Sequence, residues 1–421
     1  MKHILFIGLF ISVSLGIFAQ NYPFVDMSYN CIQVPGGDSE RLNRVLQRLN
    51  PRSLKQNGLN ILHIGGSHVQ ADIFSNQVRQ NLKKRFANDD VAVFRGYIFP
   101  YTVAKTNNPS NYKVTYSGQW NSARNVQRKH EVPLGVGGVA VYTDDPDAQI
   151  NVALNPPLNP PSTPPSPPPK GGWEFNILRM LGYSLDKSTA VKPVLSYQDN
   201  LIEGIPNATG TSYLFFVPQS ESEFSIKFVQ QEDEPHTFVV DGFIISERNT
   251  RGLVYHAIGV NGASVPSYLR CENWESELHY LNPDLVIFGI GVNDAAGDNF
   301  SKERFIANYN ALIERVERVN PNCAYIFITN NDSFRKTRKG RYVVNPNGVI
   351  AREAFYELAK QHQGGLWDLF ELMGGLGSMQ KWQKEGLAAT DKIHFKRDGY
   401  LYLGDLLYEA LMNYNLSYVK E

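Results

Sequence analysis

Two short segments of this chain hold the residue types of a nucleophilic catalyst. Ser67 follows the glycine pair at residues 65–66, and Asp391 and His394 stand three residues apart near the C-terminus. A histidine can take the proton of a serine hydroxyl and return it to a leaving alcohol, and a nearby carboxylate can fix the tautomer that does both. Each residue also has an ordinary alternative, because Ser67 can cap a helix and His394 can be a hydrogen-bonded structural histidine.

Two further segments offer hydrogen-bond donors of the kind that stabilise a negatively charged oxygen. Gly262 stands in a turn, where the absence of a side chain lets a backbone N–H approach a ligand closely. Asn293 carries a neutral side-chain amide, which is suited to an oxyanion. The alternatives are a plain turn at Gly262 and a helix-capping role for Asn293.

The segments that precede these residues are expected to be strands of one sheet. Residues 59–64, 253–258, 284–290 and 324–329 are short apolar runs. Apolar residues at helical spacing follow the first, third and fourth runs, and a last helix is expected over 398–412. This alternation predicts a parallel α/β sheet with helices on both faces. Ligands of such sheets bind at the carboxyl ends of the strands, where the candidate residues stand.

Residues 102–249 show a different pattern. Alternation at 224–228 and apolar runs at 237–240 and 243–245 predict β-strands, and helical spacing is limited to a short turn near 175–180. We therefore expect an all-β module inserted into the α/β domain after its first strand–helix unit.

The expected module contains a proline-rich run and several aromatic residues. The run at 155–169 can form neither a helix nor a sheet ladder, which predicts an extended, exposed loop. Four aromatic residues could stack on sugar rings, although packing in a core is the commoner outcome. They are Tyr112, Tyr116, Trp120 and Trp173.

The four chemistry-bearing segments together resemble the sequence blocks of SGNH (GDSL-type) hydrolases. In that family a GDS-type nucleophile block is followed by a glycine block, a GxND block and a DxxH block. The likeness covers residues 50–100 and 253–415, roughly half of the chain. One departure is Gly66, because the family usually has aspartate before the serine. The matching segments are 65–67, 259–262, 291–294 and 391–394.

The resemblance implies a role for each candidate residue. Ser67 would be the nucleophile and His394 the general base, with Asp391 holding His394 in place. The oxyanion hole would consist of the backbone N–H groups of Ser67 and Gly262 and the side-chain amide of Asn293.

A second resemblance concerns the layout of the chain. Residues 96–101 and the inserted module are similar to bacterial peptidoglycan O-acetylesterases, which carry a carbohydrate-binding-like β module between the first two blocks. The expected fold is a three-layer, flavodoxin-like parallel sheet of the SGNH type with an inserted, β-sandwich-like module. The hydrolase domain is expected over residues 21–101 and 250–421, with the module over 102–249 between its two parts.

The N-terminus has the pattern of an export signal. Lys2 and His3 precede an apolar run, and residues 1–20 end in a plausible cleavage site at Ala19. An N-terminal membrane anchor is the alternative. Because no later stretch is long and apolar enough to span a bilayer, we expect an exported protein, periplasmic or extracellular, with no stable membrane span.

The charge and the cysteine content of the chain bear on whether it binds nucleic acid or a metal. The 41 basic and 41 acidic residues give a net charge of zero, so there is no overall attraction to nucleic acid. Cys31, Cys271 and Cys323 lack the spacing of a metal site, and either one disulfide or three inert cysteines are compatible with them. We expect neither a metal nor a cofactor.

These observations predict a secreted serine esterase that removes acetyl groups from a carbohydrate, such as an acetylated polysaccharide or peptidoglycan. A glycan O-acetyltransferase with the same acyl-serine intermediate and a lipase-like esterase of the same fold are alternatives. An inactive glycan-binding protein is a third, for which Gly66 is the only supporting feature. The sequence has no G-x-S-x-G elbow, which argues against an ordinary α/β-hydrolase.

Overall fold

The structure, a computed structural model, describes residues 22–88, 90–154, 172–186, 189–248, 251–337 and 339–419. The expected signal peptide and the proline-rich run at 155–169 lie outside these residues. Within the described ranges, no helix is both long and apolar enough to cross a membrane.

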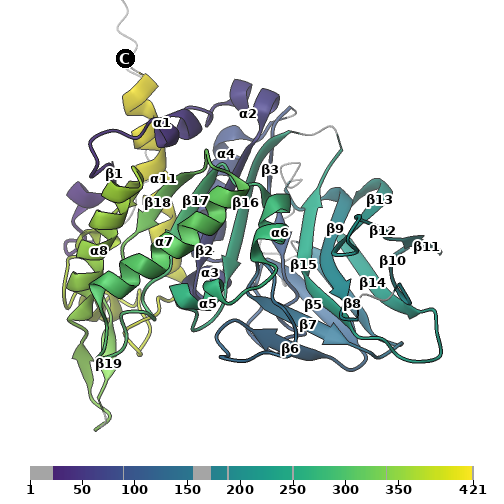
Figure 1. The fold of residues 1–421 in the computed structure, drawn as a ribbon. Coiled ribbons are helices and arrows are strands. Elements are labelled where there is room, and N and C mark those ends of the chain that lie inside the picture. Colours follow the sequence, from purple (N-terminus) through teal and green to yellow (C-terminus); the bar gives the residue numbers. More distant parts are fainter. Residues whose placement is uncertain are drawn as a thin grey trace, which may run out of the picture.

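A seven-stranded sheet forms the centre of the α/β domain (Figure 1). All its strands run parallel except β1 at one edge, which pairs antiparallel with β21. The four expected strands lie side by side within it, whereas the strands of two or three residues were too short to be recognised from an apolar pattern. In spatial order the strands are β1 (Ile32–Gln33), β21 (Gly365–Trp367), β18 (Ala324–Ile328), β17 (Leu285–Gly289), β2 (Leu59–Gly65), β16 (Gly252–Gly259) and β3 (Ala92–Phe94).

Helices cover both faces of this sheet because successive side chains of each buried strand point to opposite sides. In β2, Ile61 belongs to one hydrophobic core and Leu62 to the other. The core with Leu62 is covered by α5 (Val265–Leu269), α6 (Trp274–Leu281), α7 (Lys302–Val319) and α8 (Asn347–Gln361). The core with Ile61 is covered by α1 (Glu40–Leu46), α2 (Pro51–Asn57), α4 (Phe74–Phe86), α9 (Leu369–Leu372), α10 (Met379–Lys384) and α11 (Arg397–Val419).

The inserted module consists of two antiparallel sheets that lie beside the α/β domain (Figure 1). The prediction of a short turn near residues 175–180 is wrong, because these residues form part of a long central strand, β9 (Phe175–Ser184). One sheet has the order β11 (Asn200–Glu203), β10 (Val191–Tyr197), β14 (Glu223–Gln230), β8 (Gln149–Leu154) and β5 (Tyr112–Ser117). The other has β12 (Ile205–Pro206), β13 (Ser212–Glu221), β9 (Phe175–Ser184), β15 (Phe238–Ser246), β7 (Val139–Thr143) and β6 (Asn121–Arg124), with β4 (Tyr97–Ile98) paired to β15.

Aromatic side chains fill the space between the two sheets of the module. The ring of Phe224 lies 5.7 Å from that of Phe175 and 4.9 Å from that of Phe243, which come from the opposite sheet. Of the four aromatic residues considered for sugar stacking, Tyr112, Trp120 and Trp173 are buried, and Tyr116 is 38% exposed. Core packing therefore accounts for three of the four.

Two buried carboxyl groups meet where the module contacts α6. Asp241 lies on β15 and Glu277 on α6, and both are almost fully buried. The backbone N–H of Val136 donates to Oε2 of Glu277 at 2.7 Å, and that of Gly135 donates to Oδ1 of Asp241 at 3.3 Å. Burial raises the pKa of both groups, and the neighbouring charge of Asp241 adds to the rise at Glu277. The pair therefore holds a proton in the folded protein.

We expect Glu277→Gln to reduce the pH dependence of stability. A raised pKa in the folded state gives a contribution that is complete below the unfolded-state pKa of about 4 and is lost as the pH rises through the folded value. The variant removes one titrating group, so its free energy of unfolding should fall less than that of the wild type between about pH 5 and about pH 8. Urea unfolding at both pH values measures this. Exposed Glu223→Gln is the control, and an equal fall in all three proteins would contradict a shared proton.

Candidate active site

Ser67 begins a short helix, α3 (Ser67–Gln70), directly after β2. Gly65 is required in this sharp turn, because a Cβ there would lie 2.3 Å from Cγ2 of Val69. The helix cap is the preceding residue, so Ser67 does not cap the helix. Its Oγ instead lies 2.8 Å from Nε2 of His394, a hydrogen-bonding distance.

The loop before Ser67 is held in place without the usual aspartate. The carbonyl of Gly66 accepts the N–H groups of Val69 and Gln70 at 3.2 and 2.9 Å. The hydroxyl of Tyr268 donates to the carbonyl of Gly65 at 2.9 Å. Hydrogen bonds to the carbonyls of Gly65 and Gly66 therefore hold this loop in place, although Gly66 has no side chain that could do so.

Asp391 lies on the far side of the His394 ring from Ser67. Its Oδ2 is 2.7 Å from Nδ1 of His394, and its Oδ1 accepts the N–H groups of Ile393 and His394 at 2.9 and 3.0 Å. Partial burial alone would raise the pKa of Asp391, but these hydrogen bonds outweigh it and lower that pKa. The carboxylate is therefore ionised at neutral pH, and it holds Nδ1 as the protonated nitrogen so that Nε2 is free to accept the Ser67 proton.

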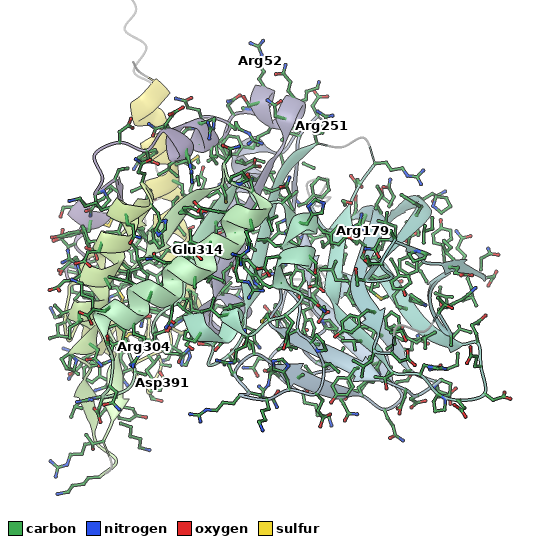
Figure 2. The ribbon with its side chains drawn as sticks, in the orientation of Figure 1. Arg52, Arg179, Arg251, Arg304, Glu314 and Asp391 are labelled. Atoms are coloured by element: carbon green, nitrogen blue, oxygen red, sulfur yellow. The ribbon has the colours of Figure 1, made fainter. Side chains whose placement is uncertain are left out.

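The serine, histidine and aspartate form one continuous hydrogen-bonded line, although their segments are far apart in sequence. Figure 2 places Asp391 at the lower side of the molecule, the side on which Figure 1 shows α3 and α5. These two helices follow β2 and β16, so the line lies at the carboxyl ends of the parallel strands. The interpretation of His394 as an isolated structural histidine is not what the structure shows.

The two expected oxyanion donors lie on loops beside the nucleophile turn. Asn293 is exposed, and its Nδ2 donates to the carbonyl of Ala263 at 2.9 Å, which leaves its second N–H available. The same Nδ2 would lie 3.4 Å from a Cβ at Gly66, so the amide is adjacent to the nucleophile turn. Gly262 has φ +82°, a conformation that favours glycine. Helix α7 is capped by Ser301, so Asn293 is not a helix cap.

Three further residues, which were not among the candidates predicted from the sequence, surround His394. Nδ1 of His68 lies 2.8 Å from the hydroxyl of Tyr400, and the His68 ring centroid is 5.3 Å from that of His394. Asn331 donates from Nδ2 to the carbonyl of Ile393 at 3.0 Å. Burial, and then the nearby imidazole of His394, lower the pKa of His68 to about 3, so His68 stays neutral.

Of these three residues around His394, only His68 and Asn331 stand at positions that the sequence could have marked as functional. His68 directly follows Ser67, and Asn331 follows strand β18 in the way that Asn293 follows β17. Position at the carboxyl end of a strand could therefore have identified Asn331. Tyr400 lies within α11 and has no such mark.

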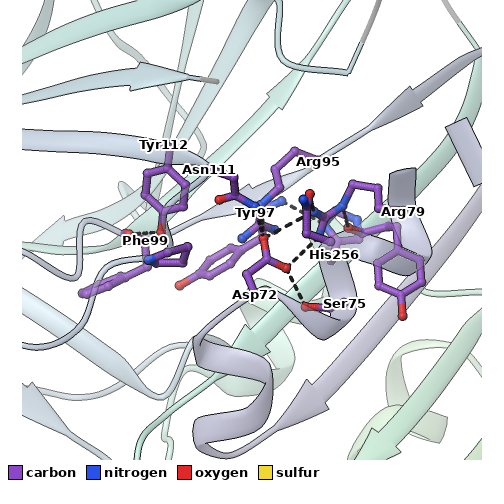
Figure 3. A network of polar contacts seen from close by, with 12 residues as sticks. Asp72, Ser75, Arg79, Arg95, Tyr97, Phe99, Asn111, Tyr112 and His256 are labelled. Atoms are coloured by element: carbon purple, nitrogen blue, oxygen red, sulfur yellow. Dashed lines mark hydrogen bonds and ion pairs between the residues drawn. The ribbon is translucent and has the colours of Figure 1, made fainter. Parts of the chain in front are cut away.

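A buried ionic network is centred on Asp72, five residues after Ser67 (Figure 3). Asp72, which follows α3 with φ +46°, pairs with Arg79 at 3.1 Å and with Arg95 at 3.2 Å. It also accepts hydrogen bonds from Ser75 at 2.5 Å and from Asn111 at 2.7 Å. Burial alone would raise the pKa of Asp72, but the two arginine charges outweigh it and lower the pKa to about 2. The network joins the segment after Ser67 to the loop that leads into β5 of the module.

We expect Asp72→Asn to destabilise the protein by about 3–5 kcal/mol, because it leaves two buried arginines without their counter-charge. Urea unfolding followed by circular dichroism measures the change. Asp199→Asn, at an exposed turn, is the matched control and should be close to neutral. A loss below about 1 kcal/mol at Asp72 would show that the arginines find other partners.

Comparisons with known proteins bear on the family. Residues 243–401 match the GDSL-like Lipase/Acylhydrolase family. The fold is similar to that of a solved structure titled "Peptidoglycan O-acetylesterase in action", with a TM-score of 0.68 and 19% identity over 92% of this chain and 99% of that chain. An acetyl xylan esterase, AlAXEase, has a TM-score of 0.31 and 21% identity over 38% of this chain and 81% of that chain.

A putative GDSL-like lipase from Parabacteroides merdae has a TM-score of 0.30 and 20% identity over 38% of this chain and 73% of that chain. No curated protein matches the chain. The predicted resemblance to the SGNH (GDSL-type) hydrolases is confirmed for residues 243–401, and the predicted fold class is confirmed by the parallel-sheet domain with its inserted β module.

Proposed function

We propose that Ser67, His394 and Asp391 are the catalytic residues of an exported esterase that removes acetyl groups from a glycan. The observation that supports this most directly is the hydrogen-bonded line from Ser67 Oγ to His394 Nε2 and from His394 Nδ1 to Asp391, at 2.8 and 2.7 Å. These are the contacts that proton transfer from a serine hydroxyl requires.

In the proposed reaction, Oγ of Ser67 attacks the acyl carbon while Nε2 of His394 takes the hydroxyl proton. The carbonyl oxygen becomes negative and accepts hydrogen bonds from the backbone N–H groups of Ser67 and Gly262 and from Nδ2 of Asn293. His394 then gives its proton to the departing sugar oxygen. Water then gives a proton to the same imidazole and attacks the acyl-serine. The bond between the acyl carbon and Oγ breaks, acetate leaves, and His394 returns the proton to Oγ of Ser67.

His68, Asn331 and Tyr400 would position the base. Asn331 binds the carbonyl of the residue before His394. Tyr400 binds His68 and also interacts with the backbone of the residue after His394. Because burial keeps His68 neutral, no positive charge from His68 stands beside the imidazolium that forms during catalysis.

The glycan substrate is supported by the layout of the chain. A solved structure whose fold is similar over 92% of this chain is that of a peptidoglycan O-acetylesterase. The β module lies beside the catalytic domain and gives a polymer a second surface to contact (Figure 1). Export is supported by the apolar run and cleavage pattern at residues 1–20.

The first functional prediction concerns the nucleophile. Ser67→Ala and His394→Ala should each lower kcat for an acetyl ester by several orders of magnitude, because the triad residues act as a unit, whereas Asp391→Asn should cost less. Hydrolysis of 4-nitrophenyl acetate measures the rates, and circular dichroism checks the fold. Ser276→Ala, on the exposed side of α6, is the control. A Ser67→Ala variant with a tenth of the wild-type rate would exclude Ser67 as the nucleophile.

The second functional prediction concerns the substrate. We expect acetyl esters to be cleaved faster than butyryl and octanoyl esters, and acetate to be released from O-acetylated peptidoglycan faster than from acetylated xylan. Chromatography of the released acids measures both series. Faster turnover of octanoyl esters would favour a lipase, and release from xylan alone would discard peptidoglycan. Transfer of the acetyl group to an added glycan, without free acetate, would identify a transferase.

A further inference from the structure

A strongly basic hairpin projects from the molecule near the proposed active site. It consists of β19 (Phe334–Lys336) and β20 (Tyr342–Val344) with the turn between them, and Figure 1 shows it extending beyond the body of the protein. Residues 334–344, here called the basic hairpin, contain five basic residues and no acidic one. Although the net charge of the whole chain is zero, positive charge is concentrated in this hairpin.

The basic hairpin is attached to the loop that carries the catalytic histidine. The N–H of Phe334 donates to the carbonyl of Lys392 at 3.0 Å, and Nζ of Lys392 lies 4.6 Å from the centre of the Phe334 ring. Lys392 itself stands between Asp391 and His394 in the sequence. The base of the hairpin is therefore next to the catalytic loop.

Most of the described cations of the hairpin are available to a partner. Lys336, Lys339 and Arg341 are exposed, and within the described part of the chain none of them has a carboxylate within ion-pair distance. Arg335 differs, because it pairs with Asp298. The turn is ordered by hydrogen bonds among its own residues, such as that from the N–H of Gly340 to the carbonyl of Thr337 at 2.8 Å.

One face of the hairpin combines positive charge with an exposed aromatic ring. Lys336 and Tyr342 are direct cross-strand partners, so their side chains lie on the same face. Phe334 lies two residues before Lys336 and therefore shares that face, on which Lys392 also packs. Tyr342 is 41% exposed. Such a face can bind a carboxylate through the cation while the aromatic ring stacks on a sugar.

We propose that the basic hairpin is a docking arm for a carboxylate-bearing glycan chain and delivers its acetylated units to Ser67. The proposal rests on the proposed function and specifies the class of polymer. Lys336 and Tyr342 lie on this face between the turn, which carries Lys339 and Arg341, and Lys392 at the base of the hairpin. A chain bound along the face would therefore extend towards the loop that carries His394. Clustered cations raise the local concentration of an anionic polymer, and this effect falls with ionic strength. A neutral acetylated polymer would gain nothing from it.

The test neutralises the hairpin in the full chain. The variant carries Lys336→Gln, Lys339→Gln and Arg341→Gln. Its control carries Arg52→Gln, Lys84→Gln and Lys360→Gln, which remove one exposed arginine and two exposed lysines from helices of the α/β domain. Binding is measured with Ser67→Ala added to each protein, by co-sedimentation with O-acetylated peptidoglycan at low and high salt. Rates are measured with active proteins on the same peptidoglycan, on acetylated xylan and on 4-nitrophenyl acetate.

We expect the hairpin variant to bind peptidoglycan roughly tenfold more weakly at low salt and to lose most of its salt dependence. Its kcat/KM on peptidoglycan should fall similarly, while its rates on xylan and 4-nitrophenyl acetate match those of the control. Equal binding by variant and control would overturn the docking arm.

Two further results distinguish a glycan docking arm from a membrane contact and from a binding protein without activity. Loss of binding to phosphatidylglycerol vesicles, with peptidoglycan binding unchanged, would overturn the docking arm in favour of a membrane contact. A wild-type protein that binds peptidoglycan through the hairpin but cleaves no acetyl ester would refute the proposed function and leave the docking arm supported.

Discussion

The hydrogen bond between Ser67 and His394 joins residues 327 positions apart, and the rest of the architecture serves to make it possible. The bond needs the carboxyl end of β2 to lie beside a loop that follows the last strand of the sheet. Parallel pairing from β2 through β17 and β18 to β21 provides this, because each strand ends at the same edge of the sheet. The proposed donors at Gly262 and Asn293 arrive there in the same way.

The β module is tied to the catalytic domain by two buried carboxyl sites with opposite electrostatics. At one, Asp72 is ionised between Arg79 and Arg95, and Asn111 reaches it from the start of the module. At the other, Asp241 and Glu277 face each other and retain a proton, and no cation among the described residues forms an ion pair with either. Asp72 follows the nucleophile helix α3, so the module and the nucleophile segment share one set of polar contacts (Figure 3).

Much of the fold could be predicted from the sequence because its central strands are buried on both faces and are mostly apolar. The catalytic candidates could be predicted because Ser67, Gly262 and Asn293 follow such strands, and because Asp391 and His394 stand three residues apart. The stretch at 175–180 was misjudged because short apolar runs do not distinguish a turn of helix from a strand. His68, Tyr400 and the partners of Asp72 depend on tertiary contacts that no local pattern records. The basic hairpin was overlooked because net charge is a sum over the whole chain.

The position of the insertion also affects how the chain folds. The module leaves the sheet after β3 and returns at β16, and these two strands are hydrogen-bonded neighbours. Within the module, β4 near its start already pairs with β15 near its end. A module that folds first therefore holds the two ends of a long loop together, and the chain entropy of closing that loop is lost before the parallel sheet forms. Non-local parallel pairing is ordinarily slow, and an early-folding insertion would accelerate it by acting as an internal template.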